Sequence, residues 1–367
     1  MKIAIIGSRG YPIVYSGYET FISNVAPRLV SKGVEVHIYC HSKLFVNKPT
    51  ELNGIYLHYM PVFSSKSLSQ LSNSLFSTLH ALFCSYDLIL YVNVANGLFG
   101  PLTKLFGVKT AINVDGLEWL RPKWKGLGAK IFMMSAKMAT RWMSVIVTDA
   151  DEMRRVYLKE FNRDSTVIAY GANLRTSTNK ERISKWGLIE RDYYLIVGRL
   201  IPDNNADFII GEFVQSKSLR KLVIVGDVPY NDAYANAVKS IKDERLVFTG
   251  YINDQDDLAE LYHNCFMYLH GHEFGGTNPT LLKALAYGCA ILAIDTTFSR
   301  EVLSDDEFGV YFKKEITNLT AIFNEFENNY KHLDVLRSKS RLRIMNKYTW
   351  EKISNDYQNL FSQMISK

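Results

Sequence analysis

Carboxylates and an aromatic ring follow one apolar run of the chain, at a place where an expected strand ends. The run TAINV is followed by Asp115, Gly116, Glu118 and Trp119. Carboxylates accept hydrogen bonds from sugar hydroxyls and take part in proton transfer. Asp115 is therefore a candidate catalytic residue that would recognise a sugar. The alternative interpretation is that Asp115 only caps the next helix.

A second set of polar groups lies in the later half of the chain. Arg199 directly follows the run YYLIVG, and an arginine at a strand end can hold a diphosphate through two parallel hydrogen bonds. A surface ion pair is the alternative for Arg199. Further on, HGHEFGGTNPTLLKA places polar residues and glycines before an expected helix, whose free amides can bind an anion. The candidate residues of this segment are Glu273, Gly275, Gly276, Thr277, Asn278 and Lys283.

The loop GSRGYPIVYSGYET after the first apolar run contains Gly7, Gly10 and Gly17. Glycines let the backbone approach a phosphate closely, although a tight turn between strand and helix would need them equally. The spacing is not GxGxxG, and the next run, VEVHIYCHS, has histidines where a dinucleotide site requires an acidic residue. The sequence therefore argues against NAD.

Short apolar runs alternate with longer segments of helical periodicity, a pattern typical of parallel sheets with crossover helices. Six such runs precede a polar pause at residues 174–191, and five follow it. We therefore predict an α/β protein with two doubly wound, Rossmann-like domains facing a central cleft, where ligands bind beyond the carboxyl ends of the strands. The expected domains are residues 1–175 and 188–345, with a final helix in 346–367 crossing back to the first domain.

Composition excludes several classes of protein. The 367 residues are 47% apolar and carry a net charge of +6, and we expect no nucleic-acid partner. The short apolar run at the N-terminus and the absence of a long apolar segment predict a cytoplasmic protein without a membrane span. Four scattered cysteines, interpreted as buried, lack the spacing of a disulfide framework or a zinc site. Asp254 and Asp256 form a DxD pattern that fits a helix cap better than a metal site. We expect neither metal nor cofactor.

One basic segment has the pattern of a membrane-binding surface. Six cations between residues 121 and 141 alternate with aromatic rings, and no acidic residue lies among them. Such a segment can lie on anionic lipid, or it can be a solvated helix face or the rim of an anion-binding cleft. The cations are Arg121, Lys123, Lys125, Lys130, Lys137 and Arg141, and the tryptophans are Trp119, Trp124 and Trp142.

Four motifs in order, GSRGYPxxYxGYETF, VDGLEW, GRLxPDNN and HGHxxGGTNPxLLxA, resemble retaining glycosyltransferase family four, which has the GT-B fold. The combination of these four motifs resembles the subgroup that contains bacterial β-1,4-rhamnosyltransferases, and the resemblance covers nearly the whole chain. The resemblance places Gly17 near the donor phosphate, Asp115 by the reacting sugar and acceptor, and Arg199 on the diphosphate, and Gly10 of the same loop is a further candidate for donor binding. It places the glycine-rich loop around the donor sugar, and Tyr251 and Ile252 beside the base.

Two positions depart from the family pattern. Asp203–Asn205 stand where the family has a lysine, and Lys283 stands where it has the glutamate that holds the ribose hydroxyls. Glu273 can then supply a carboxylate, and Lys283 can take over the contact with the diphosphate. This exchange leaves room for a deoxyribose donor such as a dTDP-sugar, with a UDP-sugar as the other donor considered.

The resemblance implies a retaining enzyme that moves a sugar, rhamnose among the candidates, from a nucleotide donor to a polyprenyl-diphosphate-linked saccharide. The expected setting is O-antigen, capsule or other cell-surface polysaccharide synthesis at the inner face of the plasma membrane, with peripheral attachment. Two alternatives stay open at this point. They are a sugar-nucleotide epimerase of the same fold and a catalytically silent scaffold subunit of a polysaccharide assembly complex.

Overall fold

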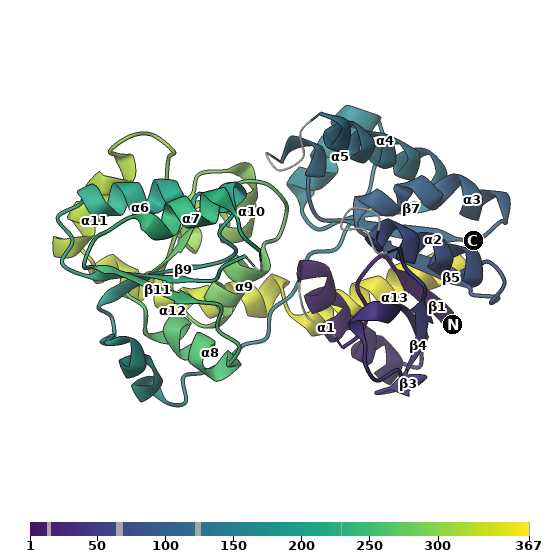
Figure 1. Ribbon diagram of the computed structural model, residues 1–367, viewed down its shortest axis with the longest axis horizontal. Coiled ribbons are helices and arrows are strands. Elements are labelled where there is room, and N and C mark those ends of the chain that lie inside the picture. The colour runs from purple at the N-terminus through teal and green to yellow at the C-terminus, as the bar shows by residue number, and fades with distance from the viewer. Residues whose placement is uncertain (13–15, 64–68, 122–125, 229, 367) are drawn as a thin grey trace. The chain divides into compact units, whose positions relative to one another are not determined.

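The computed structural model describes residues 1–12, 16–63, 69–121, 126–228 and 230–366. The chain divides into two compact units, Met1–Gly171 together with Trp350–Lys367, and Ala172–Thr349. Figure 1 shows that each unit is a sheet flanked by helices. The two Rossmann-like units are the α/β architecture that the alternating apolar runs predict.

The first unit is built on an eight-stranded sheet with the order β3-β4-β2-β1-β5-β6-β7-β8. All neighbouring strands are parallel except β3 and β4, which form an antiparallel edge pair. The central strands β1, β5 and β6 are buried almost throughout, as expected for strands covered on both faces. The strands are β1 (Lys2–Ile6), β2 (Glu35–His41), β3 (Glu51–Leu52), β4 (Ile55–Met60), β5 (Leu88–Val92), β6 (Thr110–Val114), β7 (Val145–Thr148) and β8 (Thr166–Val167).

The last helix of the chain belongs to this first unit. It packs against α1, where the rings of Phe21 and Tyr357 lie 5.0 Å apart and Lys32 pairs with Glu351 at 2.5 Å. The α-helices are α1 (Gly17–Ser31), α2 (Ser69–Ala81), α3 (Gly100–Leu105), α4 (Leu127–Trp142), α5 (Asp151–Phe161) and α13 (Trp350–Ser366), and the 3₁₀ turns are η1 (Ser42–Leu44), η2 (Val94–Phe99) and η3 (Glu118–Leu120).

The second unit has a six-stranded parallel sheet with the order β11-β10-β9-β12-β13-β14. Its strands are β9 (Tyr193–Val197), β10 (Lys221–Val225), β11 (Leu246–Gly250), β12 (Met267–His270), β13 (Ile291–Ile294) and β14 (Val310–Phe312). The α-helices are α6 (Ala206–Gln215), α7 (Ala233–Ser240), α8 (Gln255–Asn264), α9 (Pro279–Ala286), α10 (Thr297–Leu303), α11 (Asn318–Asn328) and α12 (Lys331–Lys347), and the 3₁₀ turns are η4 (Lys180–Trp186), η5 (Pro202–Asn204) and η6 (Asp305–Glu307).

The polar pause of the sequence is a structured part of the second unit. Residues 172–187 contain η4, which packs on α8. Glu260 of α8 accepts hydrogen bonds from the backbone amides of Thr178 (2.6 Å) and Asn179 (2.9 Å). A polar stretch can therefore be ordered when a neighbouring carboxylate satisfies its backbone.

Two local findings complete the fold. Within the described ranges no helix is both long and apolar enough to cross a membrane. The cysteines are free, as expected, but Cys84 is only partly buried, which corrects the interpretation that all four are core residues. Its position in the turn after α2 leaves it at the surface, and its sulfur contacts Nδ1 of His80 at 3.4 Å.

Candidate functional site

Asp115 lies just beyond the carboxyl end of β6, where two tyrosines hold its carboxylate. The hydroxyl of Tyr18, in the first turn of α1, donates to Oδ1, and the hydroxyl of Tyr170 donates to Oδ2 at 2.9 Å. Asp115 does not cap the next helix, because the residue before η3 is Leu117 and that before α4 is Gly126. The capping alternative for Asp115 is therefore wrong.

The surroundings of Asp115 shift its proton affinity. Burial raises the pKa of the Asp115 carboxyl above its usual value, although the hydrogen bond from Tyr18 and the charge of Arg121 oppose that rise. Burial also raises the pKa values of Tyr18 and Tyr170, and the neighbouring Asp115 charge adds to both shifts. The two phenols therefore stay protonated and remain hydrogen-bond donors to the carboxylate.

The neighbours of Asp115 in the VDGLEW motif have different surroundings. Glu118 pairs with Arg121 at 3.1 Å, and both side chains are only 11% exposed. Trp119 packs edge-on against Tyr157 and Phe161, with ring centroids 6.1 and 5.7 Å apart. Its ring is thus part of a local aromatic cluster, which accounts for a tryptophan at this position without a sugar.

Tyr18 and Tyr170 are site residues that the sequence reasoning missed. Tyr18 stands inside the GYET motif, and Tyr170 ends the expected strand TVIAY. A buried carboxylate requires donors, so a search for hydroxyls at neighbouring strand ends and helix starts would have found both.

The glycine loop of the first unit has a packing role at Gly10. This residue has φ +122°, and a Cβ there would lie 2.8 Å from Sγ of Cys40. Gly17 opens α1 behind a capping box formed by Ser16 and Glu19. The buried Glu19 carboxylate accepts the amides of Arg9 (3.0 Å) and Ser16 (2.9 Å). The helix start thus already holds a carboxylate, and phosphate binding by Gly10 and Gly17 stays a prediction.

Arg199 follows β9 and is exposed. No carboxylate pairs with its side chain among the residues that the structure describes, whereas its carbonyl accepts a hydrogen bond from Nδ2 of Asn204 at 2.8 Å. The alternative interpretation of Arg199, a surface ion pair, is therefore not seen among the described residues. An exposed, unpaired guanidinium at the carboxyl end of a strand is suited to bind an anion.

The loop Asp203–Asn205 fastens Arg199 to the segment after β12. Asn204 Oδ1 pairs with Nδ1 of His272 at 2.8 Å, and Asn205 Nδ2 donates to the Gly271 carbonyl at 2.8 Å. A Cβ on Gly271 would lie 2.3 Å from the Asn204 carbonyl oxygen, so only glycine fits this contact. The asparagines at the position where the resembled family has a lysine thus connect two loops at the carboxyl end of the sheet.

Glu273 also lies at the carboxyl end of this sheet, in contact with the loop Asp203–Asn205. Its Oε2 accepts hydrogen bonds from Nδ2 of Asn205 at 3.2 Å and from Nζ of Lys314 at 3.4 Å, and its amide donates to the carbonyl of Asp203 at 3.1 Å. Glu273 is partly buried, so a carboxylate is present near the glycine-rich loop. Its partners are protein groups, and direct contact with a donor sugar stays a prediction.

The loop Gly275–Asn278 leads into α9. Gly275 has φ +122°, and Thr277 is buried. Asn278 caps α9, because its Oδ1 accepts the amide of Thr280 at 2.9 Å and the Thr280 hydroxyl at 2.7 Å. The oxygen of Asn278 is therefore engaged by the helix, which leaves its amide nitrogen to contact a ligand.

Lys283 lies on α9 and is half-buried. Burial lowers the pKa of its ammonium group, and the positive charge of Arg175 lowers it further. A nearby diphosphate would favour the charged form and reverse this shift. Tyr251 is 69% exposed beyond the end of β11, and Ile252 after it is partly buried, so both are accessible to a planar ring.

Asp254 caps α8, as the sequence predicts. Its Oδ1 accepts the amides of Asp256 (2.8 Å) and Asp257 (3.2 Å), and its other oxygen pairs with Arg182 at 3.1 Å. Asp256 pairs with Arg175 and with Arg182. The DxD pattern is thus engaged in capping and ion pairs.

Two family models match parts of this chain. Residues 179–343 match the model described as Glycosyl transferases group 1, and residues 94–173 match a domain of unknown function, DUF1972. The first match covers β9 to α12, including Arg199, Glu273 and Lys283. The matched part of the second unit therefore resembles group 1 glycosyltransferases, the class that the sequence motifs predict.

Two curated relatives share part of the sequence. An N-acetylgalactosaminyltransferase of Campylobacter jejuni, named for an N-acetylgalactosamine-N,N'-diacetylbacillosaminyl-diphospho-undecaprenol substrate, is 28% identical over 36% of this chain and 35% of its own length. A probable sucrose-phosphate synthase of Thermosipho melanesiensis is 23% identical over 64% of this chain and 57% of its length. The matches span about a third and about half of these relatives. Neither is named as a rhamnosyltransferase.

Solved structures share the fold over the whole chain. Sucrose-phosphate synthase from Thermosynechococcus elongatus superposes with a TM-score of 0.83 at 16% identity, covering 100% of this chain and 99% of that one. HepE from Anabaena, solved in complex with UDP-glucose, superposes with a TM-score of 0.77 at 15% identity, covering 99% and 100%. The predicted GT-B class, with two Rossmann-like domains, is confirmed.

Proposed function

We propose that this protein is a retaining glycosyltransferase that moves a sugar from a nucleotide donor to a lipid-linked saccharide in cell-surface polysaccharide synthesis. The observation that carries the proposal is the exposed Arg199 at the carboxyl end of β9, which has no carboxylate partner among the described residues and lies inside the range that matches the Glycosyl transferases group 1 model. Ligands of open parallel sheets bind at this end of the strands.

In this proposal the second unit holds the leaving nucleoside diphosphate. Breaking the glycosyl phosphate bond places negative charge on the diphosphate, so fixed cations and amides aimed at it stabilise the transition state. Arg199 supplies a permanent charge, Lys283 a second one, and the loop Gly275–Asn278 supplies backbone amides at the start of α9. Glu273 orients the donor sugar, while Tyr251 and Ile252 flank the base.

Asp115 in the first unit acts on the acceptor or on the sugar ring. The two phenols hold the carboxylate in one orientation, so it can accept a hydrogen bond from an acceptor hydroxyl without a loss of side-chain freedom. Its raised pKa makes the carboxylate a stronger hydrogen-bond acceptor than an exposed one. The departing phosphate takes the acceptor proton on the same face, which retains the anomeric configuration.

The donor in this proposal is a dTDP-sugar, with rhamnose as the transferred group. Lys283 stands where the resembled family holds ribose hydroxyls with a glutamate, and a deoxyribose donor does not need that contact. HepE from Anabaena was solved with UDP and with UDP-glucose, so a UDP-sugar is the donor to be tested against it.

The acceptor in this proposal is linked to a polyprenyl diphosphate, as the name of the Campylobacter jejuni relative states for its own substrate. Such an acceptor lies in a membrane, so the enzyme must work at its cytoplasmic surface. One face of α4 supports peripheral attachment, because it exposes apolar and basic side chains together. The exposed side chains are Leu127 (73%), Ile131 (41%) and Met134 (50%), with Lys130, Lys137 and Arg141 beside them.

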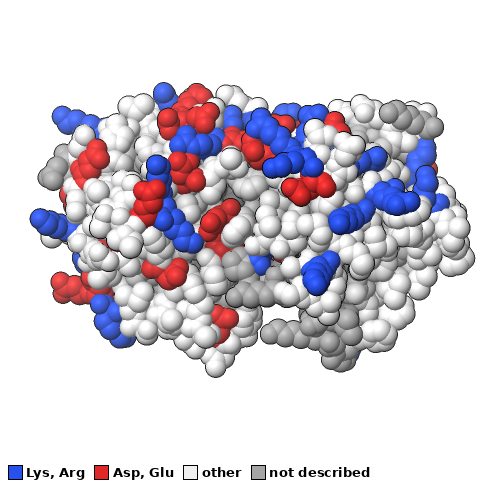
Figure 2. All heavy atoms as spheres, turned by 90° about the horizontal axis from the view of Figure 1, so that it is seen from above, with Lys and Arg blue, Asp and Glu red and all other residues white. Residues whose placement is uncertain are grey.

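The opposite face of α4, with Ser135, Ala136 and Ala139, is buried against η2. Figure 2 looks onto the side that carries α4 and α5, where blue Lys and Arg spheres predominate over red ones on the first unit. A helix that exposes leucine, isoleucine and cations in one stripe fits the interface of an anionic bilayer. Lys123, Trp124 and Lys125 of the predicted basic segment lie outside the described residues.

Vesicle binding tests the membrane part of the proposal. Reversing the charge of Lys130, Lys137 and Arg141 to glutamate should weaken partition onto phosphatidylglycerol vesicles by roughly a hundredfold, at about 1 kcal/mol for each engaged cation. A matched variant with the exposed Lys242, Lys331 and Lys339 changed to glutamate has the same net charge. Equal loss in both variants, or none in the first, would show that α4 is not the attachment surface.

Donor binding and transfer test the activity. Thermal stability should rise with one of the dTDP-, UDP- or GDP-sugars, because a ligand bound only by the folded state raises the melting temperature. The protein should then move that sugar onto a polyprenyl-diphosphate-linked saccharide with retained configuration. Release of a free sugar product would identify an epimerase, and donor binding without turnover would identify a silent subunit. Either result would refute the proposal.

A further inference from the structure

The second unit contains a cavity of about 640 Å³. It lies at the amino ends of the strands, whereas Arg199 lies at their carboxyl ends. Three of its lining residues come just before parallel strands: Arg191 before β9, Asn264 before β12 and Gly288 before β13. Arg199 and Glu273 instead follow β9 and β12. The cavity is therefore separate from the donor site proposed above, and its volume is in the range of small-molecule sites.

Arginines dominate the charge of this cavity. Arg191, Arg337 and Arg341 line it together with a Lys180–Glu190 pair (3.3 Å). Arg337 pairs with Asp334 at 2.5 Å, but the Asp334 side chain is 76% exposed. Lining charges thus comprise four cations and one carboxylate.

Two of the three arginines have no carboxylate partner among the described residues. Arg191 donates to the carbonyl of Cys265 at 2.7 Å, and Arg341 donates to the carbonyl of Arg175 at 3.0 Å. Burial lowers the pKa of Arg337, and the nearby charge of Arg191 lowers it further, so the two guanidinium groups repel each other. An anion bound in the cavity beside Arg191 would relieve this repulsion, and the planar guanidinium matches the geometry of a phosphate.

Neutral polar groups of the cavity can recognise hydroxyls. Thr178 and Ser338 line it, as does His263, which is only 6% exposed. Nδ1 of His263 lies 2.8 Å from the carbonyl of Tyr287 and therefore carries the proton. Nε2 is then an acceptor, and it has no hydrogen-bond partner among the described residues. A ligand with hydroxyl groups beside its phosphate suits this lining.

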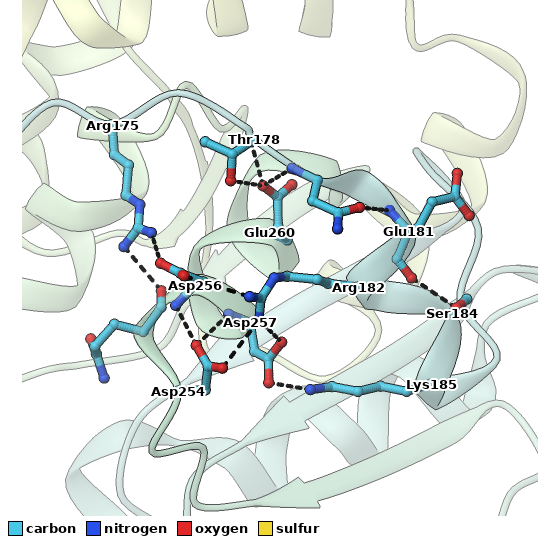
Figure 3. A network of polar contacts seen from close by, with 12 residues as sticks. Arg175, Thr178, Glu181, Arg182, Ser184, Lys185, Asp254, Asp256, Asp257 and Glu260 are labelled. Atoms are coloured by element: carbon cyan, nitrogen blue, oxygen red, sulfur yellow. Dashed lines mark hydrogen bonds and ion pairs between the residues drawn. The ribbon is translucent and has the colours of Figure 1, made fainter.

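The wall that carries Thr178 is fixed in place. Figure 3 shows Glu260 beneath Thr178, and Arg182 between Asp254 and Asp257. These contacts tie η4 to α8 before any ligand arrives. A preformed wall reduces the ordering cost of binding.

We propose that this cavity binds a phosphate monoester that carries hydroxyl groups, with Arg191 and Arg341 holding the phosphate. The phosphate can belong to a soluble sugar phosphate or to a lipid headgroup at a membrane surface. The site is additional to the proposed transfer reaction and does not depend on it, because binding can be measured without transfer.

Calorimetric titration of the full chain with glucose 6-phosphate tests the proposal. Binding is expected below about 1 mM, with none for glucose. Arg341→Gln should weaken it at least tenfold, and Arg341→Lys less. Arg191→Asn is the second variant, chosen because Arg191 has φ +61°, which asparagine tolerates. Lys242→Gln serves as the control, because Lys242 is exposed and is not part of the cavity lining.

Three further arms separate the outcomes. Arg199→Ala should bind glucose 6-phosphate with unchanged affinity, and UDP should not compete. If only phosphatidic acid vesicles bind, and Arg341→Gln and Arg191→Asn weaken that binding while Lys242→Gln does not, the phosphate belongs to a lipid. The proposal is overturned if neither probe binds, if folded Arg341→Gln and Arg191→Asn bind like wild type, or if UDP displaces the sugar phosphate.

Discussion

The carboxyl ends of the two sheets carry charged groups in opposite situations. Asp115 in the first unit is partly buried and is held by two phenolic hydroxyls, whereas Arg199 in the second unit is exposed and has no carboxylate partner among the described residues. The carboxylate site is complete without a ligand. The guanidinium of Arg199, by contrast, is open to solvent and accessible to an anion.

This difference fits the charge changes of glycosyl transfer. A group that orients an acceptor benefits from a fixed position before the reaction. The entropy lost in fixing its side chain is then lost during folding and not during catalysis. A group that receives a diphosphate must stay open until the donor binds. We therefore expect substitutions at Asp115 to alter both stability and activity, and substitutions at Arg199 to alter activity alone.

The largest effect is expected for Arg199→Ala. Removing an exposed guanidinium that has no carboxylate partner among the described residues should lower transfer by about a hundredfold or more, equivalent to about 2.7 kcal/mol, and leave the melting temperature unchanged. Turnover and thermal unfolding of the same preparation measure both quantities. Lys242→Ala, an exposed cation on the same unit, is the control. A folded Arg199→Ala protein that keeps more than about a tenth of wild-type turnover would exclude the diphosphate role.

Asp115→Asn should lower transfer by at least about tenfold, the factor that corresponds to 1.4 kcal/mol. The amide keeps the shape of the side chain but cannot accept hydrogen bonds at both ends or carry the negative charge. Steady-state kinetics with the lipid-linked acceptor and with a short soluble analogue measure the loss. Full activity of Asp115→Asn would remove the residue from the site and leave it a structural role.

Tyr170→Phe tests whether the carboxylate site is complete on its own. The hydrogen bond from Tyr170 lowers the pKa of Asp115, so its loss should raise that pKa further and destabilise the protein by roughly 1.5–3 kcal/mol at neutral pH. The same substitution should cost less in an Asp115→Asn background. Denaturant unfolding of the four proteins gives the coupling energy. Equal costs in both backgrounds would show that Tyr170 does not act through the carboxylate.

The smallest effect is the pH dependence of stability at Asp115. Because its folded-state pKa is raised, the folded protein binds this proton more tightly than the unfolded chain does. The resulting stabilisation is present in acid and is lost as the pH rises through the folded pKa. The difference in melting temperature, Asp115→Asn minus wild type, should therefore increase by a few degrees as the pH rises from about 4 to about 7. A gain in the opposite direction would mean that the carboxylate is favoured in the folded state.

The order of apolar runs determined the two Rossmann-like units, since each predicted run is a strand of β1, β2 or β5 to β13. Strand β4 was missed. Its sequence, IYLHYM, has no continuous apolar run, and His58 packs against His37 of β2, with ring centroids 5.2 Å apart. Pairing with a neighbouring strand stabilises such a segment, and the local sequence pattern does not contain the free energy of that pairing.

The sequence also placed Asp115, Arg199 and the glycine-rich loop at strand ends, because side-chain type and local pattern suffice for that. Only the tertiary structure decided their partners. Tyr18 and Tyr170 are 97 and 55 residues from Asp115 along the chain, and the three arginines of the cavity come from two separate segments. Hydrogen bonding and charge repulsion act over a few ångströms in space, so the proximity that sets them exists only after the chain has folded.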